Sequence, residues 1–261
     1  AISRALTAIG GDRAPELVAL CEVENDSVLH DLTRRSSLRT VRYNYLVTSS
    51  TDPRGIDVAL LYKPTAYRPF AHKVLRLPSN QIDEGSYVRD VLCVSGELVT
   101  GDTLDVLVCH LPSRLNGRKS ARLRQRVVTH MCSAIDSLCS MRAMPHIVVM
   151  GDFNDTPDQP ALRALSDKGR MACITGQLGG SYRYKGEWEQ IDHVYLSPML
   201  LDETHRLHLA SRGAWVSNDE FLTEPEPLYG GRRPFRTYNG MRYTGGTSDH
   251  LPVCFDLLFS W

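Results

Sequence analysis

The 261-residue sequence lacks the features that would place it in a membrane. No apolar run approaches the ~20 residues that a membrane-spanning helix needs. The first residues do not show the basic-then-apolar order of a signal peptide, and they lack an initiator methionine. We therefore expect a soluble protein whose chain is a fragment or a processed form, and its compartment stays open.

The sequence also lacks an excess of charge of either sign, because 30 basic residues balance 30 acidic ones. A protein that binds nucleic acid without regard to sequence usually carries a basic excess, so this balance weakens a nuclease hypothesis. Basic residues do cluster locally, over 114–126 and again over 232–236, where the second cluster is interleaved with aromatic residues. Either cluster could meet phosphates. A solvated helix face is the commoner explanation of the first.

Two kinds of motif are missing. The seven cysteines form no Cys-x-x-Cys pair, and most lie in apolar strand-like runs. We expect buried free thiols, which favours a reducing compartment only weakly. No Gly-x-Ser-x-Gly elbow is present, which argues against a serine hydrolase. A hydrophobic content of 42% is sufficient for a packed core.

Apolar periodicity predicts alternating strands and helices along the chain. Helices are expected over 1–12, 26–37, 118–142 and 159–168, the last ending at Gly169. Strands are expected over 17–22, 55–62, 88–98, 103–110, 146–152, 191–196, 207–216 and 253–259. Residues 217–247, rich in Gly, Pro, Tyr and Arg, are expected to form one long loop. We expect one domain over 1–261, with two sheets packed face to face and helices outside.

The segment 146–154 carries the strongest functional signal. Its apolar run predicts a buried strand that ends in Gly151 and then Asp152 and Asn154. Residues two apart in an extended segment point to the same side, so both side chains could face one ligand. A carboxylate that accepts a proton and an amide that steadies an oxyanion suit a hydrolase. Ordinary turn chemistry at a strand exit is the alternative.

Four further predicted strands also have an acid or a histidine at or beside one end. These residues are Glu22, His110, Asp192 and the pair Asp249 and His250. Solvation alone would spread such residues over loops and outer faces. The pattern therefore predicts one site on the rim of a sheet.

The motifs Leu-Cys-Glu-Val, Cys-His-Leu-Pro-Ser, Gly-Asp-Phe-Asn, Ile-Asp-His-Val and Ser-Asp-His-Leu-Pro occur in this order over about residues 15–255. In this order they resemble the endonuclease/exonuclease/phosphatase superfamily, the deoxyribonuclease-I-like metal-dependent phosphoesterases. The resemblance implies a four-layered α/β (α+β) sandwich, with two mostly antiparallel sheets flanked by helices. It also implies Mg²⁺ as cofactor, with Mn²⁺ possible.

The resemblance further implies roles for individual residues. Glu22 and Asp249 match the metal-binding carboxylates. His250 matches the essential histidine near the C-terminus, and Asp192 matches the acid that pairs with it.

Three more residues match the motifs that handle the phosphate. Asp152 would orient or deprotonate the attacking water. Asn154 would hold a phosphate oxygen. His110 would hydrogen-bond the scissile phosphate or help to protonate the leaving oxygen.

Three substrate contacts are less certain. Arg89 matches a position where the family often has a phosphate-binding arginine, although an arginine at a strand edge is usually just solvated. Asp57 and Tyr62 lie on a strand that the family places beside the site, and Asp57 could orient His110. One feature departs from the family, because no residue upstream of Glu22 matches the asparagine of its first strand. We expect that strand to be missing, which would leave a sheet edge exposed.

Three functions remain open at this stage. The first is a metal-dependent nuclease acting on DNA or RNA, supported by the arginine clusters and by Phe235, Tyr238 and Tyr243 as stacking residues. The second is a phosphatase or phosphodiesterase of a small or lipid phosphate, such as a nucleotide, an inositol phosphate or a sphingomyelin-like head group, because the fold does not choose among substrates. The third is a catalytically inactive binding module. In each case we expect a monomer.

Overall fold

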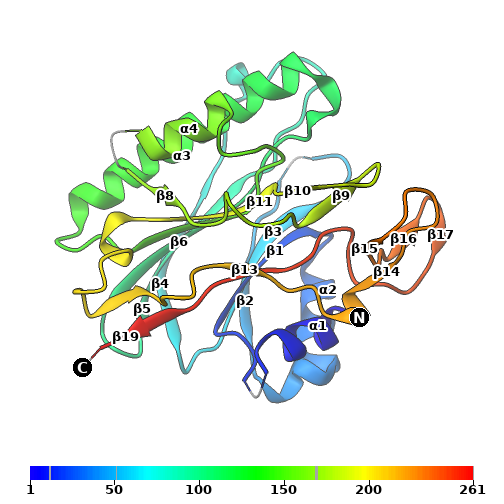
Figure 1. The fold of residues 1–261 in the computed structure, drawn as a ribbon. Helices are drawn as coiled ribbons and strands as arrows, with labels where there is room; N and C mark the ends of the chain where they lie inside the picture. Colours follow the sequence, from blue (N-terminus) through cyan, green and yellow to red (C-terminus); the bar gives the residue numbers. More distant parts are fainter. Residues whose placement is uncertain (12, 51, 168–169, 261) are drawn as a thin grey trace.

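The computed structural model describes residues 1–11, 13–50, 52–167 and 170–260. The expected helix end at Gly169 lies outside these residues. Figure 1 shows sheets as the inner layers of the molecule, with helices on both outer faces. The predicted mixed α/β architecture is therefore confirmed. In the described part of the chain no helix is both long and apolar enough to cross a membrane.

The larger sheet has six strands. In spatial order they are β4 (Tyr67–Leu75), β5 (Val91–Leu98), β6 (Thr103–His110), β7 (Ile147–Asp152), β11 (Asp192–Leu196) and β8 (Ala172–Cys173). Neighbours are antiparallel except for β6 and β7, which are parallel. A parallel pair needs a long crossover connection, and the helix between these two strands supplies it.

The second sheet has three antiparallel strands. Their spatial order is β1 (Leu17–Val23), β3 (Asp57–Tyr62) and β2 (Asn44–Val47). Among the described residues, β1 pairs with β3 alone, so its other edge carries no strand partner.

Among the described residues, four α-helices cover these sheets. They are α1 (Ile2–Ile9), α2 (Asp26–His30), α3 (Arg118–Met141) and α4 (Pro160–Ser166). The Asn25 side chain accepts a hydrogen bond from the Val28 amide and caps α2. After α2 the chain tightens into the short helical segments η1 (Asp31–Arg35) and η2 (Ser37–Thr40), where one helix had been predicted.

Alternation along β6 shows how the layers are held. Leu107 and Cys109 belong to a core shared with α3 and α4, whereas Val106 and Val108 belong to the core between the two sheets. All four side chains are buried, so β6 is covered on both of its faces. A third core lies between α1, α2 and the outer face of the second sheet.

The C-terminal half contains more strands than the sequence predicts. They are β9 (Tyr182–Tyr184) with β10 (Glu187–Glu189), β12 (Leu207–Leu209) with β19 (Leu257–Phe259), β13 (Trp215–Val216) with β18 (Val253–Cys254), β14 (Thr223–Pro225) with β15 (Arg232–Pro234), and β16 (Tyr238–Asn239) with β17 (Arg242–Tyr243). The remaining short helices are η3 (Ser79–Gln81), η4 (Arg114–Asn116), η6 (Pro198–Leu200) and η7 (Glu220–Leu222). Residues 217–247, which we call the lobe, thus form two small hairpins that project at one side of the molecule, so the single long loop predicted there is wrong (Figure 1).

Candidate active site

Three neighbouring strands of the larger sheet place polar side chains in one row. His110 at the end of β6 is in register with Asp152 at the end of β7, and Asp152 is in register with Asp192 at the start of β11. Residues in register on adjacent strands point to the same face of the sheet. These three residues therefore converge, although 82 positions separate the first from the last (192 minus 110).

Gly151 makes the register of this row possible. Its φ is +144°, and a Cβ atom there would lie 1.9 Å from the Cys109 carbonyl oxygen. Any other residue would push β6 and β7 apart beside the pair His110 and Asp152. The glycine in the Gly-Asp-Phe-Asn motif is thus explained by the close approach of two backbones.

Asp152 is buried and well supplied with donors. Its Oδ2 atom lies 3.3 Å from His110 Nε2, and its Oδ1 atom accepts a 2.8 Å hydrogen bond from the Asn154 amide. Burial would raise the pKa of this carboxyl, but the hydrogen bond from His110 and the nearby positive charges outweigh it and hold the pKa below its ordinary value. The carboxylate is therefore ionised and ready to accept a proton.

His250 and Asp192 form a second pair. His250 Nδ1 lies 2.7 Å from Asp192 Oδ2, and the same oxygen accepts a hydrogen bond from the Ser181 hydroxyl. A single β-bridge to Tyr182 holds His250 in place, with the two ring centroids 4.8 Å apart. Burial lowers the pKa of His250, but the Asp192 carboxylate, helped by Asp152, more than offsets it, and the pKa is raised to about 10.

Asn154 lies in the row but points its donors inward. Its φ is +52°, in the left-handed region that asparagine tolerates. Its Nδ2 atom donates to the Leu111 carbonyl at 3.0 Å and to Asp152 Oδ2 at 3.1 Å. Both amide hydrogens are thus used within the protein. In this structure Asn154 orients Asp152, whereas the sequence predicted that it would hold a phosphate oxygen.

Glu22 and Asp249 complete the set of acids. Glu22 sits at an irregularity of β1 with φ +59°, an unfavourable angle for a residue of this type, and its side chain is exposed. Its charge acts on Arg54 and Arg89. Asp249 is half-buried and acts on His250. The two predicted metal ligands therefore lie on segments that border the row of His110, Asp152 and Asp192. Glu22 comes from the N-terminal part of the chain and Asp249 from the C-terminal part.

The donor set fits a hard divalent cation. One ligand atom each of Asp152, Asp192 and His250 lie within 4.8 Å of one another. The Nδ1 atom of His250 already faces Asp192, which leaves the carboxylate oxygens of Asp152 and Asp192 as the hard ligands that Mg²⁺ prefers. The predicted metal ligands Glu22 and Asp249 are not part of this cluster.

The structure places the three less certain substrate contacts, Tyr62, Asp57 and Arg89, in different surroundings. Tyr62 lies at the far end of β3 from the site, opposite Leu17 and about 17 Å along the strand from Asp57. Its ring packs against Tyr67, with centroids 6.2 Å apart, so the prediction that it contacts the substrate is wrong.

Asp57 lies at the end of β3 nearest the site, but its carboxylate bonds the segment that follows β2. Its Oδ1 accepts hydrogen bonds from the Thr48 hydroxyl at 2.8 Å and from the Ser50 amide at 2.7 Å. No hydrogen bond between described residues joins it to His110, whose Nδ1 atom is buried without a partner. The prediction that Asp57 orients His110 is therefore wrong.

Arg89 is buried, not solvated. Its Nε donates to the His110 carbonyl at 3.1 Å and its Nη2 donates to the Leu111 carbonyl at 2.8 Å. Asp52, which sequence reasoning missed, accepts from its Nη1 at 3.3 Å. With only 5% of Arg89 exposed, its guanidinium holds the end of β6, and its predicted contact with the phosphate stays a prediction. No motif signals Asp52, Ser181 or Tyr182, because their roles depend on partners distant in sequence.

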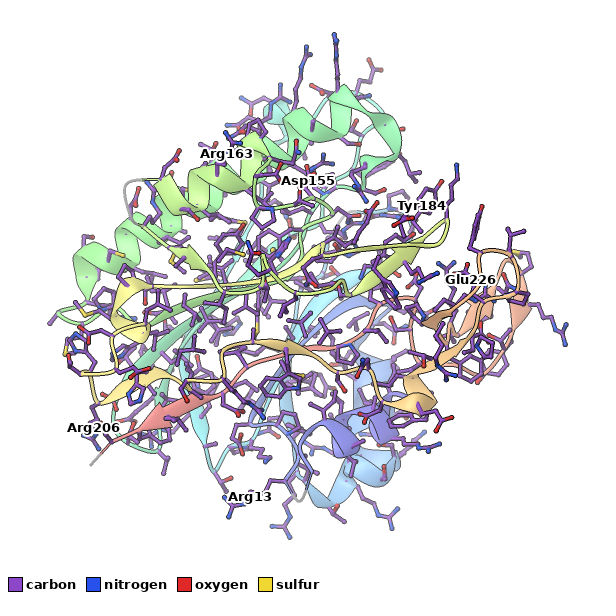
Figure 2. All side chains as sticks on the ribbon, in the orientation of Figure 1. Arg13, Asp155, Arg163, Tyr184, Arg206 and Glu226 are labelled. Atoms are coloured by element: carbon purple, nitrogen blue, oxygen red, sulfur yellow. The ribbon has the colours of Figure 1, made fainter. Side chains whose placement is uncertain are left out.

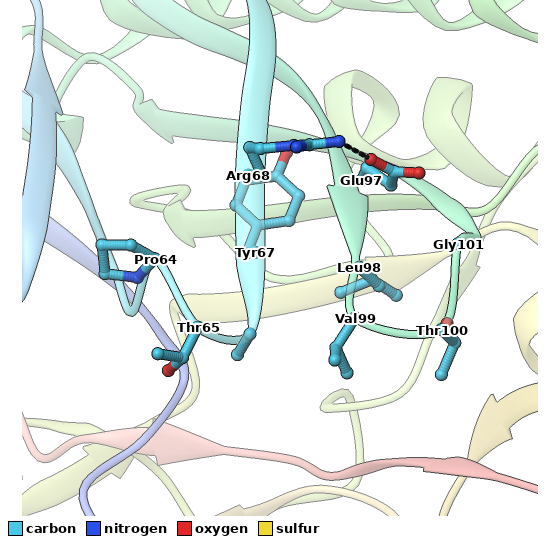
Figure 3. Close-up of a pocket in the computed structure, with 10 residues that line it drawn as sticks. Pro64, Thr65, Tyr67, Arg68, Glu97, Leu98, Val99, Thr100 and Gly101 are labelled. Atoms are coloured by element: carbon cyan, nitrogen blue, oxygen red, sulfur yellow. Dashed lines mark hydrogen bonds and ion pairs between the residues drawn. The ribbon is translucent and has the colours of Figure 1, made fainter.

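A hollow of about 480 Å³ lies away from the site, bounded by Tyr67, Arg68, Glu97 and Thr100 at the opposite end of β4 and β5 (Figure 3). An ion pair between Arg68 and Glu97 crosses it. None of the predicted site residues lines this hollow, so position in the fold, not depth, identifies the site.

Comparisons with solved structures agree with this fold. The catalytic domain of human Nocturnin with bound sulfate is 16% identical with a TM-score of 0.62, over 94% of this chain and 81% of that one. A mannosyl-6-phosphatase of Bacteroides thetaiotaomicron is 17% identical with a TM-score of 0.65, over 99% and 89%. TDP2 of D. rerio, complexed with a single-strand DNA product, is 14% identical with a TM-score of 0.63, over 98% and 90%.

At these identities the likeness establishes the fold and leaves the substrate open. A search of curated proteins found no match. The family model described as "Endonuclease/Exonuclease/phosphatase family" matches residues 1–258. With that match over nearly its whole length, the chain belongs to the Endonuclease/Exonuclease/phosphatase family, as its five motifs led us to expect.

Proposed function

We propose that the chain is a divalent-cation-dependent phosphoesterase in which water attacks phosphorus in line with the leaving oxygen. One observation carries this proposal: His110, Asp152 and Asp192 stand in one row, and His250 joins them through Asp192. An ionised carboxylate beside two imidazoles suits proton transfer from water and to a leaving group.

The thiols beneath this row do not act as nucleophiles. The Cys21 thiol donates to the Cys109 carbonyl at 3.5 Å, which places Cys21 next to the end of β6. Burial raises the pKa of both thiols, with a smaller contribution from Asp152. Because only a thiolate attacks efficiently, water is the nucleophile that the site supports.

Each residue of the row has a defined part in this proposal. Asp152 accepts a proton from the attacking water, and Asn154 keeps its carboxylate oriented. His110 donates from Nε2 toward the phosphate or the leaving oxygen. His250, held by Asp192, stabilises the charge that develops on the non-bridging oxygens.

Glu22 and Asp249, with the oxygens of Asp152, would hold the cation. A bound divalent cation polarises the phosphoryl group and stabilises a negatively charged leaving oxygen. The donor chemistry favours Mg²⁺, and Mn²⁺ accepts the same ligands.

We propose as the substrate a nucleic-acid phosphodiester, which the sequence also favours. The Arg54 side chain beside Glu22 is 58% exposed and could meet the phosphates of a long substrate. Tyr238 and Tyr243 on the neighbouring lobe are exposed and available for stacking.

A small phosphate ester is a second candidate, and the ion pairing of the basic clusters favours it. In the first cluster Arg114 pairs with Glu189 and Arg126 with Asp83. In the second, Arg233 binds Glu224. Arginines neutralised within the protein release few counterions from a polyanion, and a long nucleic acid gains little from them.

A plasmid assay tests the proposal. Supercoiled DNA is incubated with the protein and Mg²⁺, and EDTA, Asp152→Ala and Asp202→Ala serve as controls, the last an exposed acid in the turn before β12. A nuclease is supported if the plasmid is nicked, if EDTA and Asp152→Ala each abolish the nicking, and if Asp202→Ala leaves it unchanged. Hydrolysis of p-nitrophenyl phosphate without nicking supports the small ester. Activity that survives Asp152→Ala contradicts both.

A further inference from the structure

The arginines of residues 232–236 differ in their partners. Arg232 donates to the Thr223 hydroxyl and to the Glu220 backbone carbonyl, whereas Arg233 binds the carboxylate of Glu224. Arg236, three residues on, forms no ion pair with any described residue. Its Nη2 donates a long hydrogen bond to the Arg183 carbonyl at 3.5 Å, and its guanidinium also hydrogen-bonds the Tyr182 phenol.

The Arg236 guanidinium is also incompletely bonded. Its Nε atom is buried and has no partner. A guanidinium carries five N–H donors and stays charged at every physiological pH. Buried unsatisfied donors are rare in folded proteins, and each one calls for an explanation. An anion that binds beside Arg236 would supply both the missing acceptor and the missing charge.

The backbone places Arg236 beside the catalytic segment. Thr247 donates to the Phe235 carbonyl at 2.8 Å, and Gly246 donates to the Arg236 carbonyl at 3.1 Å, so this stretch is paired with the residues that lead directly into Asp249 and His250. A Cβ atom on Gly246 would lie 2.1 Å from the Phe235 carbonyl oxygen, so only glycine allows the two segments to approach this closely.

The Arg236 side chain also lies close to His250, through Tyr182. Burial raises the pKa of the Tyr182 phenol, and the adjacent Arg236 guanidinium opposes that rise. The Tyr182 ring in turn stacks against His250. Arg236 and His250 thus contact the same tyrosine. The neighbouring Arg183 is unavailable for a ligand, because Glu226 of the lobe binds its Nε at 2.6 Å; Figure 2 labels Glu226 on the lobe and Tyr184, the residue after Arg183, on the hairpin beside it.

We propose that Arg236 binds a non-bridging phosphate oxygen of the substrate beside His250 and selects phosphate monoesters over diesters. This inference rests on the proposed phosphoesterase activity, and it favours the second candidate substrate, a small phosphate ester, over a nucleic-acid phosphodiester. A monoester phosphate carries about 1.5 to 2 negative charges near pH 7, whereas a diester carries about one. A planar guanidinium binds two phosphate oxygens at once. An arginine without a counter-charge should therefore strengthen binding of the doubly charged monoester more than binding of the singly charged diester.

Binding of inorganic phosphate tests the site without a known substrate. Isothermal titration calorimetry in Mg²⁺ compares the wild-type chain with Arg236→Gln and Arg236→Lys. Arg242→Gln, an exposed arginine of the β16–β17 hairpin, is the matched control. We expect Arg236→Gln to weaken phosphate binding by roughly 10- to 100-fold, Arg236→Lys to recover part of it, and Arg242→Gln to change nothing. Unchanged phosphate affinity in Arg236→Gln overturns the proposal.

Selectivity is tested with p-nitrophenyl phosphate and bis(p-nitrophenyl) phosphate. Arg236→Gln should lower kcat/KM for the monoester at least about tenfold more than for the diester, mainly through KM. Equal losses for the two esters overturn the monoester preference. If the wild-type chain hydrolyses neither ester while its phosphate binding still depends on Arg236, the proposed function fails and the anion site stands.

Discussion

The ion pair between Arg124 and Asp155 offers the sharpest test of how the site is supported. Arg124 on α3 binds Asp155 Oδ2 through Nε at 2.9 Å and through Nη2 at 2.7 Å. It also donates to the Pro112 carbonyl at 3.0 Å. Asp155 belongs to the loop that follows β7 (Figure 2). One side chain thus joins the helix to the segments that follow His110 and Asp152.

Burial sets the size of the effect. The side chains of Arg124 and Asp155 are 5% and 11% exposed. Removing one partner of a buried pair leaves an uncompensated charge and costs about 3–5 kcal/mol. A domain is stable by only about 5–15 kcal/mol, so Arg124→Met should remove a large share of the free energy of unfolding.

Urea unfolding of four chains measures this: wild type, Arg124→Met, Asp155→Asn and the double variant. We expect the single variants to unfold at markedly lower urea and the double variant to recover a coupling energy of about 2 kcal/mol or more. Arg35→Met is the control, because its pair with Asp31 is 73% and 58% exposed and should contribute less than about 1 kcal/mol. A coupling energy no larger than that of this surface pair would refute the reasoning.

Three further predictions follow from the same structure. Gly151→Ala should fail to fold or lose several kcal/mol of stability by urea unfolding, because its Cβ would meet the Cys109 carbonyl; unfolding like wild type would contradict the register. Asp192→Asn should fold normally by circular dichroism yet lose about 100-fold or more in kcat, because an amide no longer supplies the negative charge that keeps His250 protonated and oriented; retained activity would remove this pair from the mechanism. Burial raises the pKa of Asp52, but its bonds to Arg54 outweigh burial, so the net effect is a pKa below the ordinary value. The stability that Asp52 adds should therefore be constant above about pH 5 and be lost as the pH falls below about 4. A stability difference between wild type and Asp52→Asn that does not depend on pH would exclude this.

The site could be predicted because continuous apolar runs mark the buried strands, and the polar residues at their ends stand out. His110 and Asp152 each end such a run and Asp192 begins one, and the structure places them in register on adjacent strands. Apolar runs alone do not set that register. The same reasoning identified the long helix 118–142, whose apolar stripe packs on the larger sheet.

The errors arise where the answer depends on residues far away in sequence. Periodicity states which face Tyr62 occupies but not which end of β3 meets the site. Arg89 looks exposed at a strand edge until the carbonyls that follow β6 cover it. Strands of two or three residues, as in the lobe, are too short to show any period, so residues 217–247 resembled a loop.

The pairing of the last segment has a consequence for how the protein loses activity. His250 is held by one β-bridge, and the strands after it, β18 and β19, pair over only two and three residues. The six-stranded sheet is far more extensively bonded. Segments with few backbone hydrogen bonds open before the rest of a domain does. Amide hydrogens near His250 should thus exchange faster than those of β5 and β6, and catalysis should fade on warming while the sheet remains intact.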